Sequence, residues 1–234
     1  MRVRRVITTR AGGVSKSPYD SFNLGGRVGD DPVAVAANQR RLALDLGLAE
    51  PDLVWMEQVH GRTAAVVTAP VAAPVEATDA LVTATPGLAL VALVADCTPV
   101  LLADPEAGVV AAIHAGRVGA RAGVVPAALA AMASAGAVIA RVEALLGPAA
   151  CGRCYEVPSE MQADVVTHLP GSGCRTRKGT HGLDVRAGLW QQLTDVGVAR
   201  IGVDPRCTME DSTLFSYRRD GTTGRLAALT WIEP

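Results

Sequence analysis

Three residues that commonly bind metal ions, His60, Cys97 and His114, each stand beside an apolar run of the chain. Rigid scaffolds usually hold reactive side chains where strands end in loops. Two imidazoles and a thiolate form a typical ligand set for catalytic zinc, whose fourth position stays open to water or substrate. Zinc would keep Cys97 as a thiolate and bring the pKa of a bound water toward about 7.

Two other chemistries fit the same residues. Cys97 and His114 could be the nucleophile and base of a hydrolase, with Asp96 orienting the imidazole. The three residues also resemble a blue-copper ligand set, with Met56 as the axial ligand. A multicopper oxidase is harder to sustain, because a trinuclear copper cluster would use more imidazoles than the 4 His of this chain. The spacing of the three residues matches no short metal motif and leaves these alternatives open.

The remaining cysteines form one short motif, Cys151-Gly152-Arg153-Cys154. A redox CxxC normally stands at the start of a helix in a thioredoxin-like context, whereas this one follows a Gly-Pro turn. We therefore interpret the motif as structural. Cys174 and Cys207 are isolated in the sequence.

An anion site is suggested near the N-terminus, where Arg10, Gly12, Gly13 and Ser15 follow a predicted strand at 3–8. A guanidinium, free backbone N–H groups and hydroxyls suit phosphate or a carboxylate. A simple glycine-containing turn is the alternative. Asn23, slightly further on, either binds a ligand or caps a turn.

The elements that must position these residues follow from hydrophobic patterning. Continuous apolar runs at 88–95 and 109–113, bounded by Gly, Pro and Asp, are typical of strands buried on both faces. Asp31 and Pro32 predict the start of a helix that extends to Gly47. The other predicted elements are a strand pair at 53–59 and 64–67 around His60-Gly61, strands at 78–83, 142–146, 199–203 and 226–231, and helices at 124–134, 159–169 and 184–195. We expect a single α/β or α+β domain over residues 1–234.

Composition narrows the class of function. Hydrophobic residues are 49% and charged residues 19%, as in a globular protein, and the net charge is -1 without a basic run. Nucleic-acid and membrane-surface partners therefore have no electrostatic support. The N-terminus lacks the apolar region of a signal peptide, no stretch reads as a membrane span, and five cysteines suggest free thiols. We expect a cytoplasmic protein that acts on small molecules.

Eight motifs, in order along nearly the whole chain, carry a family resemblance. They are TTRAGGVS at 8–15, SFNLG at 21–25, MEQVHG at 56–61, TDALVT at 78–83, ADCTPVLLAD at 95–104, HAG at 114–116, CYEV at 154–157 and FSYRRDGTTGR at 215–225. Together they resemble the bacterial family once called laccase-domain or polyphenol oxidoreductase proteins, now regarded as multifunctional purine nucleoside phosphorylases.

The resemblance implies a four-layer α/β/β/α fold and Zn²⁺ at His60, Cys97 and His114. Cu²⁺ is the alternative metal that the residue types leave open. It implies phosphorolysis of adenosine, inosine and 5′-methylthioadenosine, with adenosine deamination at the same site. The expected partners are therefore purine nucleosides and phosphate, and the oligomeric state is left open between monomer and homodimer. We expect Asp96 to join the metal ligands in catalysis, and the expected substrate-binding residues are Arg10, Ser15, Asn23, Gln58 and Arg117.

One motif departs from the family pattern. The histidine turn usually reads His-Ala-Gly-Trp-Arg-Gly, whereas here Arg117 and Val118 occupy the Trp and Arg positions. If the customary arginine binds an anion, Arg117 or Arg121 must reach the same point in this chain.

Overall fold

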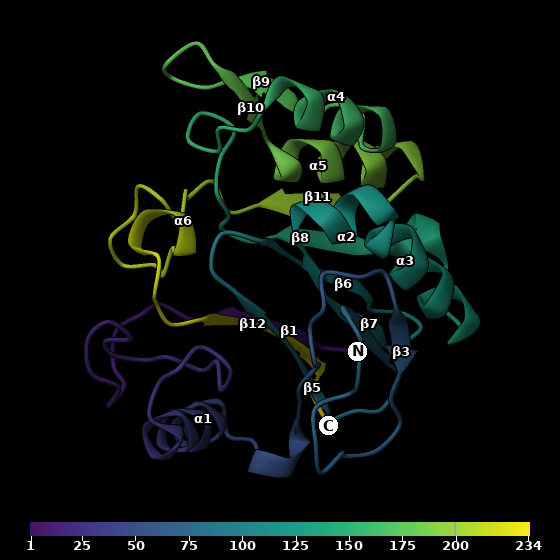
Figure 1. Ribbon diagram of the computed structural model, residues 1–234. Coiled ribbons are helices and arrows are strands. Elements are labelled where there is room, and N and C mark those ends of the chain that lie inside the picture. Colours follow the sequence, from purple (N-terminus) through teal and green to yellow (C-terminus); the bar gives the residue numbers. More distant parts are fainter. Residues whose placement is uncertain (199) are drawn as a thin grey trace.

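Two β-sheets packed face to face, with helices on both outer faces, form the four layers of the molecule (Figure 1). The structure is a computed structural model and describes residues 1–198 and 200–234. Helix α1 (Pro32–Leu46) covers one sheet, and helices α2 to α5 cover the other. The expected α/β/β/α architecture is confirmed.

The smaller sheet joins the two ends of the chain. Its order is β1-β12-β5-β2, with the last pair parallel and the others antiparallel. Its strands are β1 (Val3–Ile7), β12 (Leu226–Ile232), β5 (Ala89–Val94) and β2 (Leu53–Val54).

The larger sheet has the order β11-β8-β6-β7-β4-β3, with parallel pairs at its two edges. Its strands are β11 (Arg200–Val203), β8 (Glu143–Leu146), β6 (Thr98–Asp104), β7 (Val109–Ala115), β4 (Ala80–Thr83) and β3 (Ala64–Val66). A separate hairpin joins β9 (Gly173–Arg175) to β10 (His181–Leu183). The other helices are α2 (Arg117–Ala122), α3 (Val124–Ser134), α4 (Ser159–His168), α5 (Val185–Asp195) and α6 (Tyr217–Asp220), with 3-10 turns at Glu50–Asp52 and Ile139–Arg141.

Three layers of apolar side chains lie between the four layers of backbone. On β7, Val109, Ala111 and Ile113 pack toward the helices, whereas Val110 and Ala112 pack against the smaller sheet. Both faces of the central strands are therefore buried, which explains why they read as continuous apolar runs instead of alternating ones.

Both ends of helix α1 form as the sequence predicts. Asp31 accepts a hydrogen bond from the Val33 backbone N–H at 2.9 Å, and Gly47 adopts the left-handed conformation after the last turn. The predicted helices at 124–134, 159–169 and 184–195 agree with α3, α4 and α5 to within one residue at each end. In the predicted strand 199–203 residue 199 lies outside the described residues, and β11 occupies the remainder.

The predicted strand pair around His60 is wrong. β2 pairs with β5 in the smaller sheet, whereas β3 pairs with β4 in the larger one. Residues 55–63 therefore carry the chain from one sheet to the other, and His60 lies on this crossing. Local patterning cannot tell a hairpin from such a crossing, because both need apolar residues on either side of a turn.

Thr98 and Pro99 are the first two residues of a strand. β5 ends at Val94 in the smaller sheet, and β6 begins at Thr98 in the larger one. Residues 95–97 are a second crossing, so Cys97 enters the site directly before a strand.

Hairpin β9-β10 and helices α2 and α6 are further elements that the sequence patterns did not predict. Among the described residues, no helix is both long enough and apolar enough to span a membrane.

Candidate metal centre and surrounding pocket

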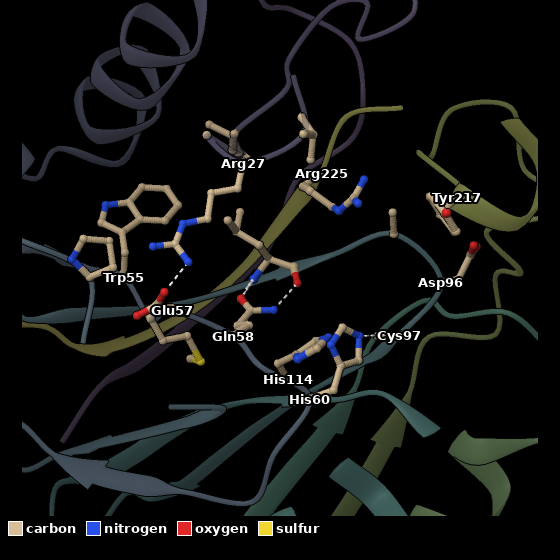
Figure 2. Close-up of a pocket in the computed structure, with 18 of the residues that line it drawn as sticks. Arg27, Trp55, Glu57, Gln58, His60, Asp96, Cys97, His114, Tyr217 and Arg225 are labelled. Atoms are coloured by element: carbon tan, nitrogen blue, oxygen red, sulfur yellow. Dashed lines mark hydrogen bonds and ion pairs between the residues drawn. The ribbon is translucent and has the colours of Figure 1, made fainter. Parts of the chain in front are cut away.

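His60, Cys97 and His114 meet at one point between the two sheets (Figure 2). Their ligand atoms lie within 4.8 Å of one another, and Cys97 Sγ is 3.8 Å from His60 Nε2. The two imidazole rings are nearly perpendicular, with centroids 4.7 Å apart. The two crossings and the end of β7 thus bring together the three residues singled out from the sequence.

Asp79, directly before β4, organises this cluster from behind. Its buried carboxylate lies 2.8 Å from Nδ1 of His114, so Nε2 is the ring atom left for a metal. It also accepts the backbone N–H groups of His60 at 3.0 Å and Gly61 at 2.6 Å. His60 has a φ of 59°, a conformation that these hydrogen bonds stabilise. The sequence analysis quoted Asp79 within TDALVT but gave it no role, because nothing local links it to residues 60 and 114.

The electrostatics of the cluster favour an ionised thiol. Burial alone would raise the pKa of Cys97, but the imidazoles of His114 and His60 outweigh it and bring this pKa to about 6. Burial alone would lower the pKa of His114, but Cys97 and Asp79 raise it to about 9. A thiolate and two imidazoles, one of them oriented by a carboxylate, fit the known preferences of zinc and copper.

The cluster lies in the wall of a pocket of about 1160 Å³. This volume is large enough for a drug-sized small molecule. The pocket is formed by the two crossings, by residues 24–28 and by the C-terminal segment, and its polar and aromatic lining includes Arg27, Trp55, Glu57, Tyr155, Tyr217 and Arg225.

Cations gather around the pocket. Figure 2 shows Arg27 and Glu57 pointing toward each other, and their ion pair holds the pKa of Glu57 below its usual range. The Arg225 guanidinium donates through Nη1 to the carbonyl oxygens of Thr223 and Gly224. Among the described residues, its Nε and Nη2 atoms donate to no protein acceptor, so they can bind an anion in the pocket.

Three predicted substrate-binding residues are not brought to the pocket. Arg10 donates to the Asp20 backbone oxygen at 2.9 Å and lies over the Phe215 ring. The Ser15 hydroxyl is buried and accepts a hydrogen bond from Asn38. The amide of Asn23 is fully buried and holds the Arg225 backbone N–H at 2.8 Å. Contacts within the protein thus use the polar groups that the sequence analysis assigned to a ligand.

Gln58, Asp96 and Arg117 do line the pocket. The Gln58 amide is already engaged, since it both donates to and accepts from the Leu93 backbone at 2.8 Å. The Asp96 carboxylate accepts from the Thr208 hydroxyl and from the backbone N–H of Arg218, both at 2.6 Å. Sequence reasoning missed Arg225, although it lies in one of the quoted motifs.

The altered histidine turn places its cation at the pocket. Arg117 begins α2 and lines the cavity, whereas Val118 is exposed. Arg121 instead forms a two-point ion pair with Asp164, with both distances 2.6 Å. Of the two arginines considered as replacements, only Arg117 reaches the pocket.

Fold and site together define a four-layer α/β/β/α protein with a candidate metal centre in a pocket of small-molecule size. The chain belongs to the family described as multi-copper polyphenol oxidoreductase laccase, whose model matches residues 4–233. The resemblance carried by the eight motifs is therefore confirmed.

Curated relatives match nearly the whole chain. A purine nucleoside phosphorylase of Corynebacterium glutamicum is 59% identical over 232 residues, which cover 98% of this chain and 94% of the relative. A purine nucleoside phosphorylase of Mycobacterium bovis is 57% identical, and the match covers 100% of this chain and 93% of the relative. The names of these relatives support an enzyme.

Solved structures support the same fold. YlmD from Geobacillus stearothermophilus matches with a TM-score of 0.92 and 33% identity, and the match covers 99% of this chain and 92% of the YlmD chain. The protein NMB0706 of Neisseria meningitidis matches with a TM-score of 0.90 and 35% identity, and the match covers 99% of this chain and 95% of the NMB0706 chain.

Proposed function

We propose that this protein is a zinc-dependent purine nucleoside phosphorylase acting on adenosine, inosine and 5′-methylthioadenosine, with adenosine deamination at the same site. The observation that carries the proposal is the convergence of His60, Cys97 and His114 in the wall of a pocket lined by arginines and aromatic rings. The names of the relatives at 57–59% identity support the substrate class.

His60, Cys97 and His114 would hold the metal, because their three ligand atoms face one another and Asp79 fixes the tautomer of His114. A zinc ion bound there supplies Lewis acidity. The pKa of Cys97, about 6, makes the thiolate its main form at pH 7, and metal binding would release the proton that His114, with a pKa of about 9, carries.

Phosphorolysis requires an anion held beside C1′ of the ribose while the purine leaves. We assign this anion to Arg225 and Arg117, which line the pocket, instead of to Arg10 and Ser15. Correct placement of the two reactants is where most of the acceleration of such a reaction arises. Gln58 keeps its position on the Leu93 backbone and shapes the pocket beside the ribose or base.

Deamination requires a proton carrier beside C6 of adenine. Asp96 is the carboxylate that we assign to this step, because it lines the pocket and its two hydrogen bonds fix its orientation. Glu57 is the second pocket carboxylate, but its ion pair with Arg27 keeps it ionised.

The proposal is tested on one purified sample by metal analysis and by chromatography of adenosine incubated with and without phosphate. We expect close to one zinc at this site, phosphate-dependent release of adenine, and inosine formed without phosphate. Cys97→Ala should remove this zinc and the deamination while the circular dichroism spectrum stays unchanged. Full deamination by a Cys97→Ala variant that has lost this zinc would overturn the proposal.

A cysteine hydrolase is the second candidate, because Cys97, His114 and Asp79 also form an ordered thiol, imidazole and carboxylate series. Such an enzyme would be blocked by a thiol alkylator and would be unaffected by chelation.

A copper redox protein would instead show visible absorbance on copper loading. His60 and His114 are the pocket's two histidines, whereas His168 is exposed and His181 binds Gln162, which leaves too few imidazoles for a trinuclear cluster.

A further inference from the structure

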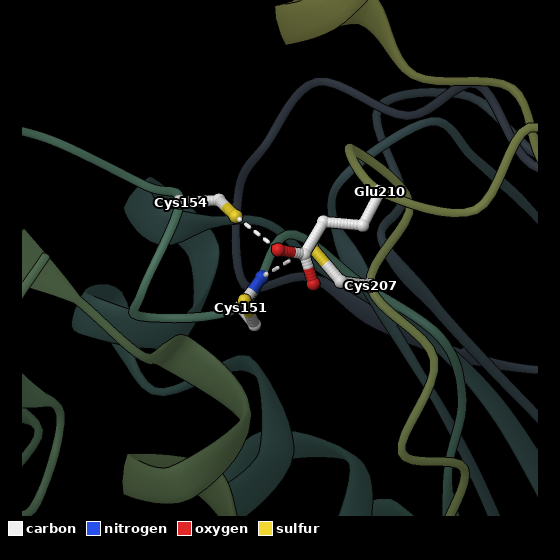
Figure 3. A group of neighbouring side chains, drawn as sticks. All are labelled: Cys151, Cys154, Cys207 and Glu210. Atoms are coloured by element: carbon white, nitrogen blue, oxygen red, sulfur yellow. Dashed lines mark hydrogen bonds between the residues drawn. The ribbon is translucent and has the colours of Figure 1, made fainter. Parts of the chain in front are cut away.

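Cys151, Cys154, Cys207 and Glu210 form a second cluster of ligand side chains, none of which lines the pocket (Figure 3). Their ligand atoms all lie within 4.8 Å of one another, although residues 154 and 207 are far apart in the sequence. Cys207 is buried, Cys151 and Cys154 are half-buried, and all three are free thiols. The function proposed above uses none of these residues.

Two turns are held together so that these side chains face one another. Ala149 and Cys207 form a parallel bridge, and the Thr208 backbone N–H donates to the Ala149 oxygen at 3.2 Å. The CxxC turn closes on itself through the backbone N–H of Cys154, which donates to the Cys151 oxygen at 2.9 Å. The turn at 207–210 closes in the same way, with the Glu210 N–H donating to the Cys207 oxygen at 3.1 Å. The backbone thus fixes the ligands without the help of a metal.

The hydrogen bonds of the sulfur atoms also suit metal-bound thiolates. The Cys151 backbone N–H points at Cys207 Sγ, 3.3 Å away, and such donors stabilise negative charge on sulfur. Cys154 Sγ donates to Glu210 Oε1 at 3.3 Å, so this sulfur and this carboxylate already face each other.

We propose that Cys151, Cys154, Cys207 and Glu210 form a second metal site, a closed four-ligand Zn²⁺ site with a structural role. Three sulfurs and one carboxylate oxygen complete a tetrahedron, which leaves no open position for catalysis. Binding would release the three thiol protons to solvent, and the carboxylate would bind as the anion. Arg177, which pairs with Glu210, offsets part of the resulting negative charge.

This position connects the second site to the pocket wall. Thr208 follows Cys207 directly and donates to Asp96, and Arg219 donates to the Thr208 backbone oxygen at 2.8 Å. On the other turn, Tyr155 directly follows Cys154. The Arg218 guanidinium lies over the Tyr155 ring, with its Cζ 4.9 Å from the ring centroid. A metal that ties the two turns together would therefore hold the side of the pocket that carries Tyr155, Tyr217 and Arg218.

The test is a count of zinc per chain, by elemental analysis and native mass spectrometry, after saturation with ZnCl₂ under reducing conditions and gel filtration. Wild type should hold two zinc ions. Cys97→Ala should hold one, and so should Cys154→Ser and Glu210→Gln, which change partly exposed side chains and leave the core intact. Cys174→Ser is the matched control, because Cys174 lies beside Gly152 but belongs to neither ligand set, and it should still hold two.

Cobalt gives a second readout on the Cys97→Ala background, where only the proposed site remains. Titration with CoCl₂ should produce thiolate-to-cobalt absorbance that is lost when Cys154→Ser is added. Wild type with one zinc and Cys97→Ala with none would overturn the inference. So would a disulfide between Cys151 and Cys154 or Cys207, detected by intact mass after alkylation of the non-reduced protein. Failure of nucleoside turnover alone would bear on the proposed function and leave this count unchanged.

Discussion

The Asp79 carboxylate lies 2.8 Å from Nδ1 of His114 and also accepts the backbone N–H of His60 at 3.0 Å. A single buried side chain therefore sets both the ring orientation of one proposed metal ligand and the backbone of another. The two histidines come from different parts of the chain. Asp79 links the crossing, on which His60 lies, to the end of β7, where His114 lies.

Asp79→Asn should weaken zinc binding at the His60, Cys97 and His114 site by about 10–100-fold, the usual effect of losing an outer-shell carboxylate. The amide cannot accept every hydrogen bond that the carboxylate accepts, and it favours a different tautomer of His114. Chelator competition on a Cys154→Ser background would measure the affinity of this site alone. Asp164→Asn, which weakens the exposed pairs of this carboxylate with Arg121 and His168, is the control and should leave the affinity unchanged.

Gly116→Ala should also disturb the site, but by steric contact. A Cβ at this position would come within 2.8 Å of Cys97 Sγ and of His60 Cδ2. We expect zinc affinity to fall about tenfold or more, because the two ligands must move apart. Gly26→Ala, where a Cβ would meet nothing within 4 Å, should bind zinc like wild type. Equal affinities of the two variants would contradict the close approach of both ligands to the Gly116 turn.

Arg225→Gln should raise the KM for phosphate by about tenfold or more and leave phosphate-independent deamination of adenosine nearly unchanged. Arg225 has donors facing the pocket, whereas the guanidinium of Arg10 is held by Asp20 and Phe215. Steady-state kinetics with and without phosphate separate the two reactions. Arg10→Gln should show no selective loss of phosphorolysis, and a selective loss in that variant would return the phosphate to the N-terminal loop.

Asp104 gives a prediction about stability and pH. Burial would raise its pKa, but hydrogen bonds from the Val138 and Ala107 backbone and from Arg141 lower it below the ordinary value. A depressed folded-state pKa stabilises the protein at neutral pH, and this stabilisation is lost as the pH falls below about 4 through the folded-state pKa. Asp104→Asn should therefore cost about 2–3 kcal/mol of unfolding free energy at pH 7 and progressively less in acid.

Urea unfolding of wild type and Asp104→Asn between pH 7 and pH 2.5 measures this difference. Glu106→Gln is the matched control, since Glu106 pairs with the same Arg141 but is largely exposed. Such an exposed pair contributes under about 1 kcal/mol. A pH-independent difference between wild type and Asp104→Asn would show that the charge of Asp104 is not what stabilises this turn.

The sequence by itself determined the local elements and the chemistry of the ligands. The cap at Asp31, the stop at Gly47 and the apolar runs at 88–95 and 109–113 predicted α1, β5 and β7, because caps and burial patterns act over a few residues. His60, Cys97 and His114 were singled out by type and by their place beside apolar runs. The family resemblance supplied the layer order.

Only the tertiary structure decided which groups meet. It placed β2 and β3 in different sheets and made the segments around His60 and Cys97 crossings. It also turned Ser15 and Asn23 inward, where buried polar groups must find partners within the protein. Asp79, Arg225 and the cluster around Cys207 emerged only there, because hydrogen bonds and ligand sets join residues by distance in space, which patterns within a short stretch of sequence do not contain.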